Sequence, residues 1–145
     1  MPRGRPDFFG TPIHERYGVC KQANGFETAE FMVEKELVNV SAKGMLAGGF
    51  VSTIDTDALP QNVVGIKIDG NWITSHAFIV LLNQGIFSGT DQPMVLVRYM
   101  PDLPAYSVAF PIDLPFETSI SFWYMNTAVN PVVVSYWLVY YDIEA

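Results

Sequence analysis

Turn-forming residues interrupt this chain about every ten residues from position 50 onward, which limits the length of any regular element. The runs between the turns are short and rich in β-branched and aromatic residues, as in "VVGIKI" at 63–68, "MVLVRYM" at 94–100 and "AYSVAF" at 105–110. Short strands joined by regular turns are typical of a β-sandwich or barrel. The sequence therefore predicts an all-β fold, an antiparallel β-sandwich.

One turn is especially well defined. Asp69-Gly70 separates the run at 63–68 from "NWITSHAFIV" at 71–80. An Asp-Gly pair between β-rich runs favours a tight hairpin, because both central residues of that turn must adopt a positive φ. We expect the two runs to be paired strands.

Residues 26–47 leave helix and strand open. Val33 and Leu37 lie on one side of a strand together with Phe31, but they also lie on one face of a helix together with Ala29. Periodicity does not decide such a run. The β-branched residues near its end and the Gly-rich "KGMLAGGF" that follows favour strand.

The last two runs, at 118–126 and 132–141, are predicted to pair with each other around a loop at 127–131. With Asn126 opposite Val132, the core face would carry Ile120, Phe122 and Tyr124. The opposite face would carry Trp123, Trp137, Met125, Ser121 and Ser135, with the two tryptophans as diagonal neighbours. Tryptophan next to small residues is typical of protein contacts, so this face is the predicted subunit interface. The alternative is a second core layer, with a helix or loop covering the face.

The first 23 residues differ from the rest in charge and pattern. They carry a net charge of +2, whereas residues 24–145 carry −9. We interpret residues 1–23 as an extended N-terminal arm and residues 24–145 as the sandwich domain; the alternative is a loose terminus. The residues expected to dock the arm on a partner are Arg3, Arg5, Phe8, Phe9, Ile13, Arg16 and Tyr17.

The overall composition argues against several classes of protein. The net charge is −7 with eight Lys and Arg residues, so the basic surface that nucleic acid requires is missing. A single cysteine, Cys20, allows no intramolecular disulfide bond. No apolar run reaches the roughly 18–20 residues of a membrane helix, and the first residues lack the pattern of a signal peptide. We expect a protein of the cytosol, or of a particle assembled there, with no nucleic-acid or membrane partner.

No motif for catalysis or metal binding is complete. "GIFSG" at 85–89 has the wrong spacing for a nucleophile elbow, and the two histidines, His14 and His76, are far apart. Asp55 and Asp57 resemble the start of a calcium loop, but the remaining ligands are missing. Four glutamates at 27–36 are interpreted as a solvated face. The sequence predicts a protein that is not an enzyme and has no catalytic residues, cofactor or metal.

The apolar-aromatic arm, the single β-domain and the terminal "DLPFETSISFWYMNTAVNPVVVSYWLVYYD" resemble the decoration, or cement, proteins on the capsids of tailed viruses. That resemblance implies a single jelly roll that forms a homo-oligomer, expected to be a trimer. It also implies a position on the virion surface, assembly in the host cytoplasm and the major capsid protein as partner, with neighbouring capsomers clamped together.

The sequence leaves two alternatives to this function. A carbohydrate-binding sandwich, lectin-like or receptor-binding, would use Trp72, Trp123 or Trp137 as a stacking platform. A small cupin-like enzyme is disfavoured by the shortage of metal ligands.

Overall fold

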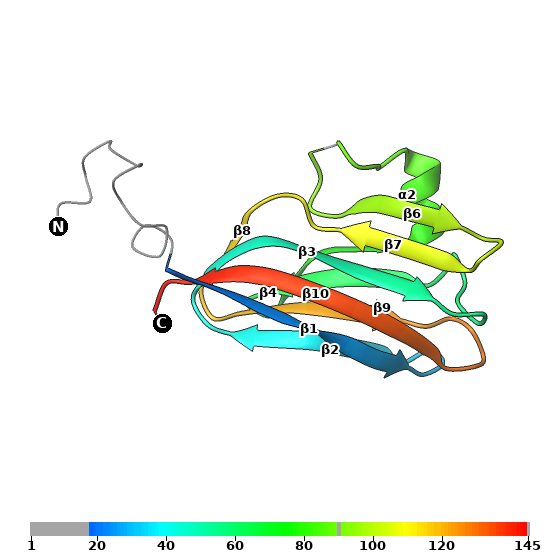
Figure 1. Cartoon of the computed structure of the whole chain (residues 1–145), viewed down its shortest axis with the longest axis horizontal. Helices are drawn as coiled ribbons and strands as arrows, with labels where there is room; N and C mark the ends of the chain where they lie inside the picture. Colours follow the sequence, from blue (N-terminus) through cyan, green and yellow to red (C-terminus); the bar gives the residue numbers. More distant parts are fainter. Residues whose placement is uncertain (1–17, 90, 145) are drawn as a thin grey trace.

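The computed structural model describes residues 18–89 and 91–144 and confirms the all-β sandwich: two antiparallel sheets pack face to face (Figure 1). The six-stranded sheet has the order β1-β10-β3-β7-β6, with β8 also paired to β3, and the four-stranded sheet has the order β2-β9-β4-β5. The strands are β1 (Val19–Ala29), β2 (Glu34–Ser41), β3 (Gly44–Ile54), β4 (Val63–Ile68), β5 (Asn71–Ala77), β6 (Val95–Met100), β7 (Ala105–Ala109), β8 (Leu114–Phe116), β9 (Ser119–Met125) and β10 (Val132–Asp142).

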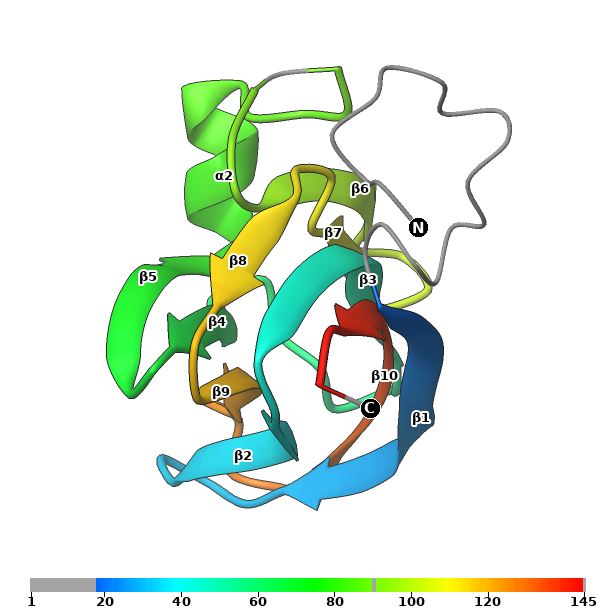
Figure 2. The same ribbon diagram turned by 90° about the vertical axis from the view of Figure 1, so that its left-hand side faces the viewer.

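The strand pairing is that of a jelly roll. The early strands β1, β2, β3 and β4 pair with β10, β9, β7 and β5, so that the chain resembles one long hairpin. Two further pairings, β10 with β3 and β9 with β4, roll this hairpin into two sheets. Viewed along the strands, β4, β9 and β2 lie in one layer and β3, β10 and β1 in the other (Figure 2).

The core lies between the sheets and is filled by alternate residues of each strand. Phe122 of β9 stacks on Phe110, just after β7, with ring centroids 4.4 Å apart, so this pair joins the two layers. Gly49 of β3 faces the same space. A Cβ there would lie 2.9 Å from Cζ of Phe122, so a larger residue would push the sheets apart.

The Asp69-Gly70 hairpin is confirmed. Both residues have positive φ, 53° and 82°, and they connect β4 to β5. The Asp69 carboxylate also accepts hydrogen bonds from the backbone N–H groups of Thr118, Ser119 and Glu117, which connect β8 to β9. These hydrogen bonds stabilise the ionised form and lower the pKa of Asp69 to about 2.

The expectation of strand through residue 80 is wrong. β5 ends at Ala77, and Phe78–Gln84 form the short helix α2. The first N–H groups of the helix donate to carbonyls of the loop that precedes β4. Phe78 donates to the carbonyl of Asn62 and Ile79 to that of Pro60. The helix ends at Gly85, in the left-handed region, and packs against β5, β6 and β7. It therefore closes the side of the sandwich where β5 and β6 are edge strands (Figure 1).

The predicted pairing of the last two strands is also wrong. β9 lies in the four-stranded sheet and β10 in the six-stranded sheet, so the chain crosses the sandwich between Met125 and Val132. The buried side chain of Asn126 holds this crossing: its Nδ2 donates to the carbonyls of Ala29 and Asn130. The inward face was nevertheless predicted correctly, because Ile120, Phe122 and Tyr124 are buried.

The sandwich begins before residue 24. Val19–Ala29 pair with β10 along their whole length, from Val19 opposite Asp142 to Ala29 opposite Val132. Residues 19–23 therefore belong to the sheet rather than to an arm. Residues 26–47 cover the end of β1, all of β2 and the start of β3, so they form strands, as favoured above. The seven residues predicted to dock the arm lie outside the described part of the chain.

Within residues 18–89 and 91–144, no helix has the length and apolar character needed to cross a membrane.

Candidate functional site

The outer face of the four-stranded sheet carries a cluster of two tryptophans and a lysine. Trp123 of β9 and Trp72 of β5 lie on either side of β4, with ring centroids 5.8 Å apart and planes at 61°. The ammonium of Lys67 lies 4.5 Å from the Trp72 centroid and 4.4 Å from the Trp123 centroid. A cation over both rings orients them by attraction to their π faces.

A glycine makes room for this cluster. Gly65 of β4 pairs with both Trp123 and Ser75, so it lies between the strands that carry the tryptophans. A Cβ at Gly65 would come within 2.6 Å of Cζ3 of Trp72. The Trp72 ring therefore lies directly on the backbone of β4, in a position that only glycine permits, and still has 44% of its surface exposed.

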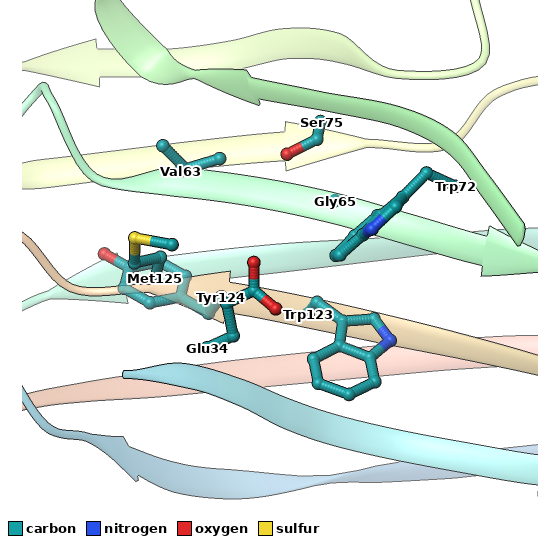
Figure 3. A pocket seen from close by; sticks show the side chains of 8 residues that line it. All are labelled: Glu34, Val63, Gly65, Trp72, Ser75, Trp123, Tyr124 and Met125. Carbon is teal, nitrogen blue, oxygen red and sulfur yellow. The ribbon is translucent and has the colours of Figure 1, made fainter. Parts of the chain in front are cut away.

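Two carboxylates from β2 border the same cluster. Glu34 is opposite Met125 and Glu36 opposite Trp123 in the pairing with β9. Figure 3 shows the Glu34 side chain reaching between Met125 and Trp123. One oxygen of Glu36, Oε1, is buried without a hydrogen-bond partner among the described residues. This "tryptophan face" comprises Glu34, Glu36, Gly65, Lys67, Trp72, Ser75, Trp123 and Met125.

A small niche opens in the tryptophan face. It is lined by Glu34, Val63, Gly65, Trp72, Ser75, Trp123, Tyr124 and Met125 and has a volume of about 20 Å³ (Figure 3). That volume accommodates one group of the size of a water molecule. A ligand would therefore lie across the face and place a single polar group in the niche.

The outer face of the six-stranded sheet has different chemistry. Phe26 of β1 is 77% exposed and Ile54 of β3 is 67% exposed. Between them, Trp137 of β10 packs against Phe50 of β3 with centroids 5.9 Å apart and donates through Nε1 to Gln22. This "apolar face" comprises Phe26, Phe50, Ile54, Val97, Val133 and Trp137, with Ser52, Ser107 and Ser135 along its middle.

The serines of the apolar face bond to the protein and not outward. Ser52 and Ser107 share a hydrogen bond of 2.7 Å between their Oγ atoms, and Ser135 donates to the Ser52 carbonyl. Shallow depressions on both sides of Phe50 reach Trp137 and Val139 on one side and Val97 and Arg98 on the other. The serines therefore add little polarity to a surface that is otherwise apolar.

The five predicted interface residues do not form one patch. Trp123, Met125 and Ser121 lie on β9, whereas Trp137 and Ser135 lie on β10 in the other sheet. Trp123 donates through Nε1 to Ser121, which is buried beneath it. The tryptophans that meet are Trp72 and Trp123, whose strands lie on either side of β4.

Sequence reasoning missed most of the apolar face. Phe26, Ile54 and Val97 are isolated in the sequence and come together because β1, β3 and β6 belong to one sheet. It also missed an exposed apolar loop, Phe31, Met32 and Val33, in the connection between β1 and β2. Three consecutive large apolar residues were a usable signal there, but they were assigned to a strand or helix.

The acidic turn at Asp55 and Asp57 is a structural feature. Asp55 accepts hydrogen bonds from the N–H groups of Asp57 and Val133, and Asp57 accepts one from Asn130. In the described ranges no group of three or more His, Cys, Asp or Glu side chains is placed to hold a metal ion. Tyr124, whose pKa is raised by burial, receives a hydrogen bond from Asn62 in the core.

Comparison with known proteins gives no match, either to a protein-family model or to a curated protein.

Proposed function

We propose that this chain is a structural protein of a virus particle, a capsid-surface decoration protein that associates with copies of itself through the apolar face. The observation that carries the proposal is the size of this face: six large apolar side chains from β1, β3, β6 and β10, four of them more than 45% exposed. Contiguous apolar surface on this scale marks a contact site, because leaving it in water is costly.

A second copy of the chain is the occupant that fits the charge. Each copy carries a net charge of −7, so two copies repel through most of their surfaces. None of the nine residues of the apolar face is acidic. Arg98 lies at its margin beside Val97, and the Asp55 carboxylate lies at another margin, where it accepts the N–H of Val133. Contact through this face keeps most of the carboxylates of both copies outside the interface. The expected assembly is closed, and a trimer agrees with the decoration proteins that the sequence resembles.

The exposed loop at Phe31, Met32 and Val33 suits a second contact, with the major capsid protein. Met32 has a φ of 58° and donates its N–H to the Asn126 carbonyl, so the loop is held to the crossing between the sheets. A restrained loop loses less conformational entropy on binding than a free one.

The experiment is native mass spectrometry of the full chain at micromolar concentration, with Ile54→Lys as the test variant. A lysine at this exposed position of the apolar face should weaken association at least tenfold, equal to about 1.4 kcal/mol. Ile73→Lys is the matched control, since Ile73 is also exposed but lies on β5 of the other sheet. A monomeric wild type, or an Ile54→Lys variant that assembles as tightly as wild type, contradicts the proposal.

A further inference from the structure

The tryptophan face remains unused by self-association through the other sheet. It combines an exposed indole, a niche for one small polar group and the carboxylate of Glu34, which makes no hydrogen bond with the described residues. We infer that the tryptophan face binds a neutral saccharide, with one pyranose ring stacked on Trp72 and one hydroxyl group in the niche beside Glu34. This inference does not depend on the self-association of the chain.

The indole supplies the stacking surface. One side of a pyranose ring presents C–H groups that carry slight positive charge, and these are attracted to the negative face of an aromatic ring. Trp72 is held in place by Gly65, against which the Cζ3 atom of the ring lies, and by Lys67, whose ammonium lies over the ring 4.5 Å from its centroid. The sugar therefore stacks on the 44% of the Trp72 surface that stays exposed. A ring fixed before binding loses little entropy when the ligand arrives.

The polar groups around the indole match hydroxyl groups. Glu34 makes no hydrogen bond or ion pair with the described residues, so both of its oxygens can accept hydrogen bonds from a ligand. The indole N–H of Trp72 donates to no group in the described chain, whereas that of Trp123 is used by Ser121. A ligand with several hydroxyl groups offers both donors and acceptors to these positions.

The charges of the face select against other ligands. An acidic sugar would approach Glu34 and Glu36, which repel it. A quaternary ammonium group would be repelled by the Lys67 ammonium, which lies 4.5 Å from the Trp72 centroid and 4.4 Å from the Trp123 centroid. A neutral saccharide avoids both conflicts.

The test uses the full chain and tryptophan fluorescence titrations with neutral pentasaccharides of glucose, mannose and galactose, and with oligogalacturonate as the acidic counterpart. At least one neutral pentasaccharide should bind and change the fluorescence, and oligogalacturonate should bind at least tenfold more weakly. Trp72→Ala and Glu34→Gln should each lower the association constant at least tenfold. Since the loss of Trp72 also changes the signal, calorimetry supplies the affinities of the variants.

Trp137→Ala is the matched control, because Trp137 is exposed to a similar extent, 41%, but lies on the apolar face. It should bind the saccharide as wild type does. Circular dichroism melts confirm that each variant is folded, and Trp72→Phe keeps a stacking ring should Trp72→Ala fail to fold; partial binding is then expected. Absence of binding by every neutral pentasaccharide, unchanged binding by Glu34→Gln together with either folded Trp72 variant, or a preference for oligogalacturonate overturns the inference.

Discussion

The two outer faces of this sandwich are built on the same jelly roll and differ in almost every chemical respect. The apolar face has Phe26 and Ile54 in water and serines that bond to one another. The tryptophan face has Trp72 and Trp123 in contact with a lysine and bordered by the carboxylates of Glu34 and Glu36. The inward faces of both sheets are mainly apolar. The fold therefore constrains the residues of each strand that point into the core, whereas the residues that point outward can vary and carry function.

The difference also separates two ways of using an aromatic side chain. Trp137 packs against Phe50 in the middle of a flat apolar surface, where its burial by a partner would stabilise a contact. Trp72 lies beside a niche with polar groups around it, the arrangement that orients a small ligand. An exposed tryptophan by itself does not distinguish these uses; its neighbours do.

The largest effect is expected from truncating the edge of the apolar face. Deletion of residues 1–23 removes Val19–Ala23 and their pairing with β10, which should lower the melting temperature by roughly 10 °C, given a few kcal/mol of lost strand hydrogen bonds. Deletion of residues 1–17 leaves β1 intact and should change the melting temperature by only a few degrees. Thermal melts followed by circular dichroism compare the two. Equal melting temperatures for both truncations would show that the first half of β1 contributes nothing to the sheet.

The shorter truncation also tests the arm without damage to the sheet. If the arm docks on a neighbouring subunit or capsid protein, deletion of residues 1–17 should weaken binding to particles that lack this protein at least tenfold, equal to about 1.4 kcal/mol. Co-sedimentation with such particles measures it. Full binding by the truncated chain would remove the arm from the proposed stapling role.

A smaller loss of stability is expected when a methyl group is added to β3, and its size should depend on whether the group points into the core or outward. Gly49→Ala places a methyl group 2.9 Å from the Phe122 ring and 2.6 Å from the Trp137 carbonyl oxygen, so it should destabilise the protein by about 1–3 kcal/mol. Gly48→Ala is the matched control, because nothing lies within 4 Å of its Cβ position. Urea unfolding of both variants gives the free energies. A Gly48→Ala variant as unstable as Gly49→Ala would mean that the outer face is covered.

The smallest effect concerns the hairpin of the four-stranded sheet. Because its folded pKa is lowered from 3.8 to about 2, ionised Asp69 stabilises the fold above pH 4, and this contribution is lost as the pH falls from about 4 to about 2. Asp69→Asn removes the ionisation. The difference in urea midpoint between wild type and Asp69→Asn should be constant above pH 4 and shrink towards pH 2. A difference that does not vary with pH would assign the effect to hydrogen-bond geometry alone.

The sequence determined the strands and their inward faces. Alternation in 119–125 identified Ile120, Phe122 and Tyr124 as core, and Asp69-Gly70 identified a hairpin, because both are local properties of a few consecutive residues. The turn spacing correctly indicated a sandwich. The acidic composition argued against a nucleic-acid partner, and the single cysteine allowed no intramolecular disulfide bond. Neither observation located a functional site.

Only the tertiary structure decided which strands meet. The alternation of β9 and β10 is the same whether they pair with each other or lie in opposite sheets, so it could not reveal the crossing that Asn126 holds. The helix α2 likewise depends on carbonyls of Pro60 and Asn62, about 18 residues away, which no local pattern contains. Both outer faces combine residues from several strands. Their composition depends on strand order, which is set by long-range packing and not by the sequence of any one segment.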